Sequence, residues 1–236
     1  MSLTSVKQGI KIADIHFEIE CDPTLLSHLE PKLGGFFTNG VAPYKLVMRQ
    51  NGPENSKWLN NAVPHMVPHP NKIIVRQDGI FELEMDLNTR CAELSYRLRP
   101  GDLTHRWPPR GPWMGLKCLY ASLLLRKEQG AMVHAGGVYK NNKAFVFLGH
   151  SGAGKSTLTE LLENRWGHQA VLNDESIALV FSKGCVVAHS TPFSGLLDRK
   201  RFRNQANAHM LLNLVQDTKT EFHPFAIADR LRLAME

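Results

Sequence analysis

Residues 149–156 read Gly-His-Ser-Gly-Ala-Gly-Lys-Ser. It matches the phosphate-loop (P-loop) pattern G-x-x-x-x-G-K-[ST] at every fixed position. The preceding run 145–148, Phe-Val-Phe-Leu, is typical of a buried strand, and residues 155–165 are typical of a helix. The sequence therefore predicts strand, glycine-rich loop and helix in succession, which is the context that the motif requires.

The residue types of the motif explain how it holds phosphate. Glycines let the backbone turn without a Cβ clash, so that successive N–H groups point at one anion, and the helix that follows adds the positive end of its dipole. Lys155 supplies a full charge to the β and γ phosphates, and the hydroxyl of Ser156 is expected to bind Mg²⁺. The predicted nucleotide contacts are Gly149, His150, Ser151, Gly152, Ala153, Gly154, Lys155, Ser156 and Thr157.

Two acids follow the next apolar run along the chain. Residues 170–173 form a short apolar strand that ends in Asp174 and Glu175. Carboxylates at the end of a strand near phosphates can bind Mg²⁺ or accept a proton from an incoming hydroxyl. The sequence predicts Asp174 and Glu175 as metal ligands and Asp174 as the catalytic base. The alternative interpretation is a solvated turn.

The first hundred residues predict a separate β-rich module. Several short runs alternate apolar and polar residues or are apolar throughout, and turn formers such as Asn51-Gly52 and Asp78-Gly79 separate them. We expect an antiparallel sheet from strands at 15–19, 44–49, 72–77, 80–87 and 92–98. A proline-rich connector, residues 107–113, follows. The predicted domains are a β-rich N-terminal module at 1–106 and a P-loop domain at 107–236.

The second module combines helices with further strands, which makes the predicted fold class α/β of the α+β type. A helix over 113–127 is expected to begin it, because apolar residues recur there at helical spacing. The other predicted strands are 132–138, 144–148, 170–173, 177–181 and 185–189. The other predicted helices are 155–165, 198–215 and 226–235.

Composition restricts the classes of partner. The chain has 236 residues, of which 43% are hydrophobic, and 28 Lys and Arg against 22 Asp and Glu give a net charge of +6. This charge favours anionic partners such as nucleotides. Only 199–203 forms a basic run, and no nucleic-acid-binding module is recognisable. The sequence has no apolar run long enough to span a membrane and no secretory signal in residues 1–12. Its four cysteines are scattered, and we expect them to be reduced thiols. We expect a cytoplasmic protein with no membrane or nucleic-acid partner.

The order and spacing of His134, the P-loop and the paired acids resemble the catalytic domain of HPr kinase/phosphorylase. The resemblance runs from Met132 to Leu179 and extends more loosely to HPr-kinase-like proteins. Those proteins are similar in having a β-rich N-terminal region, a run like Val133–Val138 and a loop like Thr-Pro-Phe-Ser-Gly, which stands here at 191–195.

The resemblance implies a fold and a set of roles. The fold would be like the nucleotide-binding domain of phosphoenolpyruvate carboxykinase, a mixed sheet with the P-loop at its edge. Asp174 would be the general base, Glu175 an acid at or near Mg²⁺, and His134 a catalytic partner that orients Asp174; a homo-oligomer is also implied. The sequence departs from the family in having Glu175 where a second aspartate is usual and His150 where an acid is frequent.

The function expected from the sequence is an ATP- and Mg²⁺-dependent kinase. It would transfer the γ-phosphoryl group to a hydroxyl of a peptide, a protein serine or a small molecule. Alternatives are a nucleotide-sensing module without transfer and an ATPase or carboxykinase-like enzyme. The loop 191–195 is either part of the acceptor pocket or a tight turn after a strand. The run 199–203 either supplies an arginine that stabilises the transferring phosphoryl group or is a solvated basic face of a helix.

Overall fold

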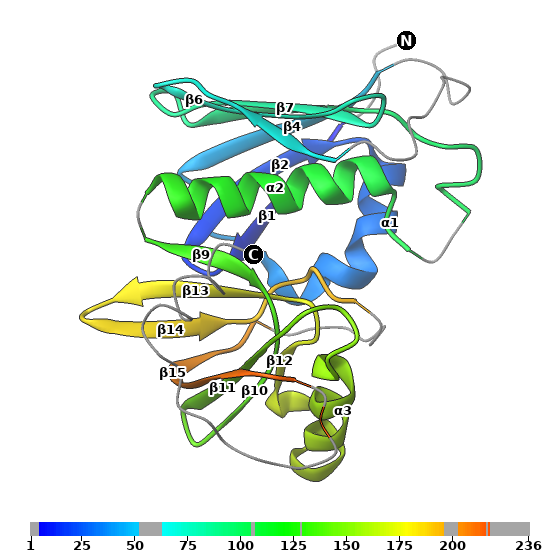
Figure 1. The fold of residues 1–236 in the computed structure, drawn as a ribbon. Coiled ribbons are helices and arrows are strands. Elements are labelled where there is room, and N and C mark those ends of the chain that lie inside the picture. The colour runs from blue at the N-terminus through cyan, green and yellow to red at the C-terminus, as the bar shows by residue number, and fades with distance from the viewer. Residues whose placement is uncertain are drawn as a thin grey trace.

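A computed structural model describes residues 5–51, 63–104, 107–127, 129–195, 203–215 and 217. Within these residues the chain forms two mixed β-sheets and three α-helices, which confirms the α+β class. Figure 1 shows the sheets at opposite ends of the molecule, with helix α2 (Arg110–Arg126) between them. None of the described helices is long and apolar enough to cross a membrane.

The first sheet has eight strands in the order β3-β1-β2-β4-β8-β7-β6-β5. Its central strands alternate buried and less buried residues, as the period of two in the sequence predicts. The strands are β1 (Val6–Ile12), β2 (Ile15–Cys21), β3 (Phe37–Thr38), β4 (Tyr44–Gln50), β5 (His65–Val67), β6 (Lys72–Gln77), β7 (Phe81–Asp86) and β8 (Cys91–Tyr96).

This sheet is mixed, so the prediction of an antiparallel sheet is wrong for two of its pairings. Strand β4 pairs in parallel with both β2 and β8. Parallel neighbours need a crossover connection, and helix α1 (Pro23–Leu33), followed by the short helix η1 (Gly34–Phe36), connects β2 toward β4. The sequence analysis missed α1, although Asp22 caps it by accepting a hydrogen bond from the Thr24 N–H at 2.7 Å.

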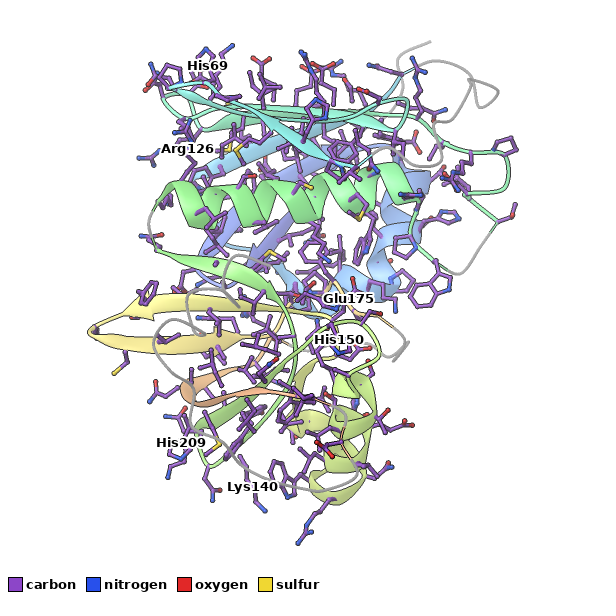
Figure 2. All side chains as sticks on the ribbon, in the orientation of Figure 1. His69, Arg126, Lys140, His150, Glu175 and His209 are labelled. Carbon is purple, nitrogen blue, oxygen red and sulfur yellow. The ribbon has the colours of Figure 1, made fainter. Side chains whose placement is uncertain are left out.

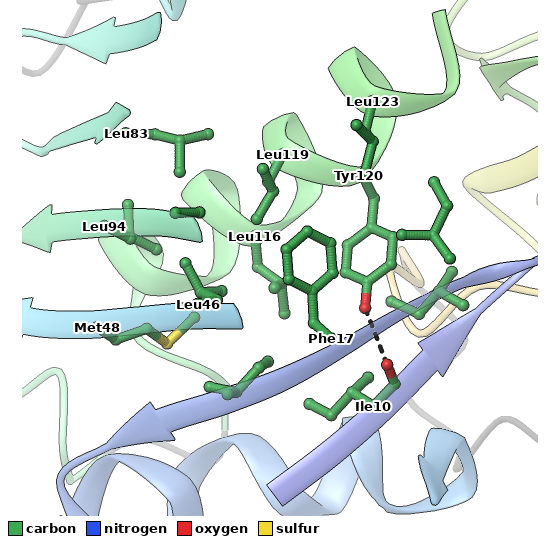
Figure 3. Packing of buried hydrophobic residues seen from close by; sticks show 14 of the residues in the cluster. Ile10, Phe17, Leu46, Met48, Leu83, Leu94, Leu116, Leu119, Tyr120 and Leu123 are labelled. Carbon is green, nitrogen blue, oxygen red and sulfur yellow. Dashed lines mark hydrogen bonds between the residues drawn. The ribbon is translucent and has the colours of Figure 1, made fainter. Parts of the chain in front are cut away.

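Helix α2 confirms the helix predicted over 113–127, but it packs against the first sheet. Its apolar residues share one core with that sheet, and the Tyr120 hydroxyl donates a hydrogen bond to the Ile10 carbonyl at 3.2 Å (Figure 3). A Cβ at Gly115 would lie 2.4 Å from a methyl of Leu94, so glycine lets the helix approach the sheet closely. The helix expected to open the second module therefore completes the core of the first.

The second sheet has seven strands in the order β12-β10-β11-β15-β14-β13-β9. Strand β11 has partners on both sides, antiparallel β10 and parallel β15. The strands are β9 (Gly130–His134), β10 (Gly136–Lys140), β11 (Lys143–Leu148), β12 (Val171–Asn173), β13 (Ser176–Ser182), β14 (Cys185–His189) and β15 (Gln205–Asn213), and the helices are α3 (Lys155–Trp166) and η2 (His168–Ala170).

The helix predicted at 198–215 is wrong where the structure describes it, because 205–213 is strand β15. The strand fills the position between β11 and β14, and pairing with both neighbours outweighs a local pattern that fits a helix. The helix predicted at 226–235 lies outside the described residues, as does most of the basic run 199–203. All four cysteines are free thiols, as expected.

Candidate active site

Two bent strand pairs bring His134 and the acid pair together. Strand β9 continues into β10 after Ala135, and β12 continues into β13 after residues 174–175. Strands β9 and β13 pair with each other up to these two points, where Ser176 is the register partner of His134. Between the strands, the Ala135 N–H donates to the Glu175 carbonyl at 2.9 Å. The acids therefore lie at a bend in the sheet, opposite the residues that follow His134.

The same bend adjoins the glycine loop, residues 149–154. Gly136, the first residue of β10, pairs with Phe147 near the end of β11. A Cβ on Gly136 would lie 2.6 Å from the Thr159 hydroxyl and 3.2 Å from the Lys155 carbonyl of α3. Glycine at this position therefore lets the first turn of α3 reach the bend. Residues 135–136 contact the acid turn on one side and the start of α3 on the other.

The glycine loop has the backbone that its glycines permit. Gly149, Gly152 and Gly154 have φ values of 138°, 84° and 96°, in the region that side chains rarely adopt. A Cβ at Gly152 or Gly154 would meet no atom within 4 Å, so open space lies beside the loop. Gly154 is also the N-cap of α3 and has no side chain to accept from the first N–H groups of the helix. This arrangement fits an anion.

Lys155 is folded back over the loop. Only 6% of it is exposed, and its ammonium group donates to the carbonyls of Gly149 at 2.6 Å and His150 at 3.0 Å. Burial lowers its pKa. The charge is thus held at the loop by two backbone oxygens, and a phosphate group at the loop would be an alternative partner of higher charge.

Asn173 fixes the turn that carries the acids, and sequence analysis missed this role. Its side chain is fully buried, and its Oδ1 accepts the N–H groups of Asp174 at 2.7 Å, Glu175 at 2.9 Å and Ser176 at 3.3 Å. Its Nδ2 donates to the Thr191 carbonyl at 2.7 Å. An asparagine before a turn is a recognisable signal for such bonds, but the link to Thr191 is visible only in the fold.

Replacing Asn173 with Ala is expected to lower the free energy of unfolding by about 3 kcal/mol, because buried N–H groups lose their acceptor. Chemical denaturation of the purified variant measures this loss. Asn164→Ala, at an exposed position of α3, is the matched control and is expected to stay within about 0.5 kcal/mol of the native protein. Equal stabilities of the two variants would contradict the role assigned to Asn173.

The two acids differ in environment. Asp174 is 2% exposed and its Oδ1 accepts the Gly195 N–H at 3.3 Å, whereas Glu175 is partly exposed and forms an ion pair with Lys117 of α2 at 3.1 Å. A Cβ at Gly195 would lie 2.7 Å from Glu175 Oε2, so glycine lets the loop 191–195 approach the acids. The structure thus brings this loop next to the acid pair. Figure 2 labels Glu175 of the acid turn and His150 of the glycine loop.

His134 is exposed at the end of β9. Its pKa is lowered, first by desolvation and then by the positive charge of Lys155, while the charge of Glu175 raises it and that of Lys117 lowers it. The imidazole therefore lies within electrostatic reach of the glycine loop and of the acid turn, and it is mostly neutral at pH 7. Its predicted role in orienting Asp174 stays a prediction.

The residues predicted to bind metal do not form an all-protein cage. Among the residues that the structure describes, no group of three or more His, Cys, Asp or Glu is placed to hold a metal ion. Mg²⁺ bound with a nucleotide needs only one or two protein ligands, since phosphate oxygens and water complete its shell. Ser156 is half-buried and Glu175 is partly exposed, and their role as Mg²⁺ ligands stays a prediction.

Asn213 is a second residue that sequence analysis missed. It ends β15, where it is the parallel partner of Leu148, the last residue before the glycine loop. Among the residues that the structure describes, its Oδ1 is buried and has no hydrogen-bond partner, and a Cβ at Gly149 would lie 3.6 Å from it. A buried acceptor without a donor is costly, so this oxygen fits a donor that arrives with a ligand at the loop.

Two surface hollows lie away from these residues. One, of about 320 Å³, is lined by Tyr139, Lys140, Arg165, Trp166, Gln169 and Ala170. The other, of about 170 Å³, lies on the first sheet. Neither includes the glycine loop or the acid turn. Phosphate loops hold their ligand on backbone N–H groups.

No protein-family model matches the chain, and no curated protein matches its sequence. The resemblance to HPr kinase/phosphorylase is therefore carried by the residues quoted above.

Proposed function

We propose that the protein is an ATP- and Mg²⁺-dependent kinase that phosphorylates a hydroxyl group of a peptide, a protein serine or a small molecule. The observation that carries the proposal is the contact of residues 135–136 with both the acid turn and the first turn of α3. This contact supports the proposal that the phosphate-type loop with Lys155 and the buried carboxylate of Asp174 act in one site.

The glycine loop and the N-terminus of α3 bind the phosphates of the nucleotide through backbone N–H groups. Lys155 exchanges its two carbonyl partners in the loop for the β and γ phosphates. Ser156 and Glu175 hold Mg²⁺, which, when bound, neutralises part of the phosphate charge. Phosphoryl transfer needs positioning and charge neutralisation more than covalent chemistry, and these residues supply both.

Asp174 accepts the proton of the acceptor hydroxyl. As the acceptor oxygen bonds to the γ phosphorus, the bond from that phosphorus to the β–γ bridging oxygen breaks and ADP leaves. The Gly195 N–H holds one oxygen of Asp174, so the loop 191–195 lies where the acceptor would bind. His134 is proposed to keep Asp174 oriented, as the resemblance to HPr kinase/phosphorylase implies; the geometric support is that Ala135, the next residue, donates its N–H to the Glu175 carbonyl at the acid turn.

The proposal is tested by incubating the purified chain with γ-labelled MgATP and a fractionated extract of the source cell. Label is expected in a discrete acceptor, whose mass identifies it. Binding of MgATP with no labelled product and no phosphate release would overturn the kinase and favour nucleotide sensing. Release of inorganic phosphate without any labelled acceptor would favour an ATPase.

Asn213→Ala is expected to lower MgATP affinity about tenfold, since a hydrogen bond in a desolvated site contributes roughly 1–2 kcal/mol. The free energy of unfolding without nucleotide is expected to change little, because the lost oxygen has no hydrogen-bond partner in the part of the chain that the structure describes. Calorimetric titration and denaturation measure the two quantities. Asn207→Ala, at an exposed position of the same strand, is the control. Unchanged affinity would remove Asn213 from the site.

A further inference from the structure

Helix α2 belongs to the core of the first sheet, yet two of its residues reach the site on the second sheet. Lys117 Nζ lies 3.1 Å from Glu175 Oε1. Trp113, four residues earlier and therefore on the same face of the helix, packs edge-on against Phe193 of the loop 191–195, with ring centroids 5.1 Å apart. The first half of the chain thus contributes side chains to the candidate active site.

The ion pair between Lys117 and Glu175 is not required by the fold. The two side chains are 25% and 35% exposed, and pairs with that access to water contribute about 0–1 kcal/mol. The packing of α2 is supplied by its buried apolar residues and by Tyr120. The ion pair therefore adds little to the attachment of the helix, and it places a cation beside the acid turn.

Lys117 lies where its positive charge could contact a phosphoryl group bound between the two sheets. Its partner Glu175 follows Asp174 directly, and the backbone of Glu175 is bonded to Ala135 at the bend that also adjoins α3. Lys117 lies at one side of this bend through its ion pair with Glu175, and Lys155 begins the helix that adjoins the bend at Gly136. One cation comes from the glycine loop and the other from the opposite helix.

We propose that Lys117 is a further catalytic residue, which pairs with Glu175 in the empty site and contacts the oxygens of the γ-phosphoryl group during transfer. The inference rests on the proposed kinase function. The transferred group carries its charge on three equatorial oxygens, so a second cation opposite Lys155 stabilises the transition state. The bonds that form and break are those of the transfer already described, and Lys117 stays protonated throughout.

The role is tested with the full chain and MgATP by comparing native protein with Lys117→Met and Lys117→Arg. Lys117→Met is expected to lower the kcat of γ-phosphoryl transfer about a hundredfold, because removing one donor that stabilises the charge of a transition state has an effect of that size. The KM for MgATP and its Kd are expected to change less than threefold. Lys117→Arg, which keeps the charge, is expected to recover at least a tenth of the native kcat. Lys143→Met, at an exposed position of β11, is the control.

The possible outcomes separate this proposal from the kinase proposal. Native protein that transfers phosphate to no acceptor and releases none to water overturns both. An active native protein with an equally active Lys117→Met variant overturns only the role of Lys117. A Lys117→Met variant that loses MgATP affinity and thermal stability together with kcat shows a structural role and also overturns it. Loss of kcat alone, restored by arginine, supports it.

Discussion

Asp174→Asn is expected to lower phosphoryl transfer about a thousandfold, because general-base catalysis contributes roughly two to four orders of magnitude. Asparagine has nearly the same shape and keeps an oxygen that can accept the Gly195 N–H, but it cannot take the proton of the acceptor hydroxyl. MgATP affinity is expected to stay within threefold of the native value. Single-turnover transfer of labelled phosphate and calorimetric titration with MgATP measure the two effects.

The control for Asp174→Asn is Asp78→Asn, the same change at an exposed turn of the first sheet. It is expected to leave transfer unchanged. Thermal melting of both variants checks that the fold persists. If Asp174→Asn transferred phosphate at the native rate, another group would have to be the base, and the assignment of the buried carboxylate would be wrong.

Lys155→Ala is expected to weaken MgATP binding at least about a hundredfold, because it removes the charge-assisted hydrogen bonds of the glycine loop to phosphate. Transfer is expected to fall by a larger factor, since the same charge stabilises the transferring group. Without nucleotide the variant is expected to lose no more than about 3 kcal/mol of its free energy of unfolding, because the carbonyls of Gly149 and His150 lose one donor, and His150 is exposed to water that can replace it.

Arg165→Ala is the matched control for Lys155→Ala, since it removes an exposed positive charge near the other end of the same helix. Titration with MgATP is expected to give the native affinity. Native-like binding by Lys155→Ala would mean that the glycine loop does not hold the phosphates, and the kinase proposal would lose its foundation.

The parts of the site that are local in sequence could be predicted. Residues 143–166 contain β11, the glycine loop and α3 in succession, and each has a local cause. A run of apolar residues predicts the strand, glycines that adopt positive φ predict the loop, and a helical pattern predicts the helix. The acid pair after β12 was predictable for the same reason, since a short apolar run ends there. Helix α2 was predictable from its apolar spacing.

Long-range contacts were not predictable from the pattern. Residues 205–213 form a strand because β11 and β14 lie on either side of them, and the parallel pairings of β4 depend on a crossover through α1. Asn213 lies beside the glycine loop because its strand pairs in parallel with β11 and ends opposite Leu148. The residues next to Asn213 in the sequence give no sign of that pairing. In each case the deciding partner is distant in the chain.

The glycine loop as a predicted phosphate site, and the acid pair as predicted Mg²⁺ and proton acceptors, follow from the sequence alone, because backbone freedom and side-chain chemistry are properties of single residues and their neighbours. Three contacts appear only in the folded chain: Asn173 holds the acid turn, the loop 191–195 lies against it, and Lys117 reaches it from the helix of the other sheet. These contacts depend on how two sheets and the helix between them pack, and packing is set by the whole core.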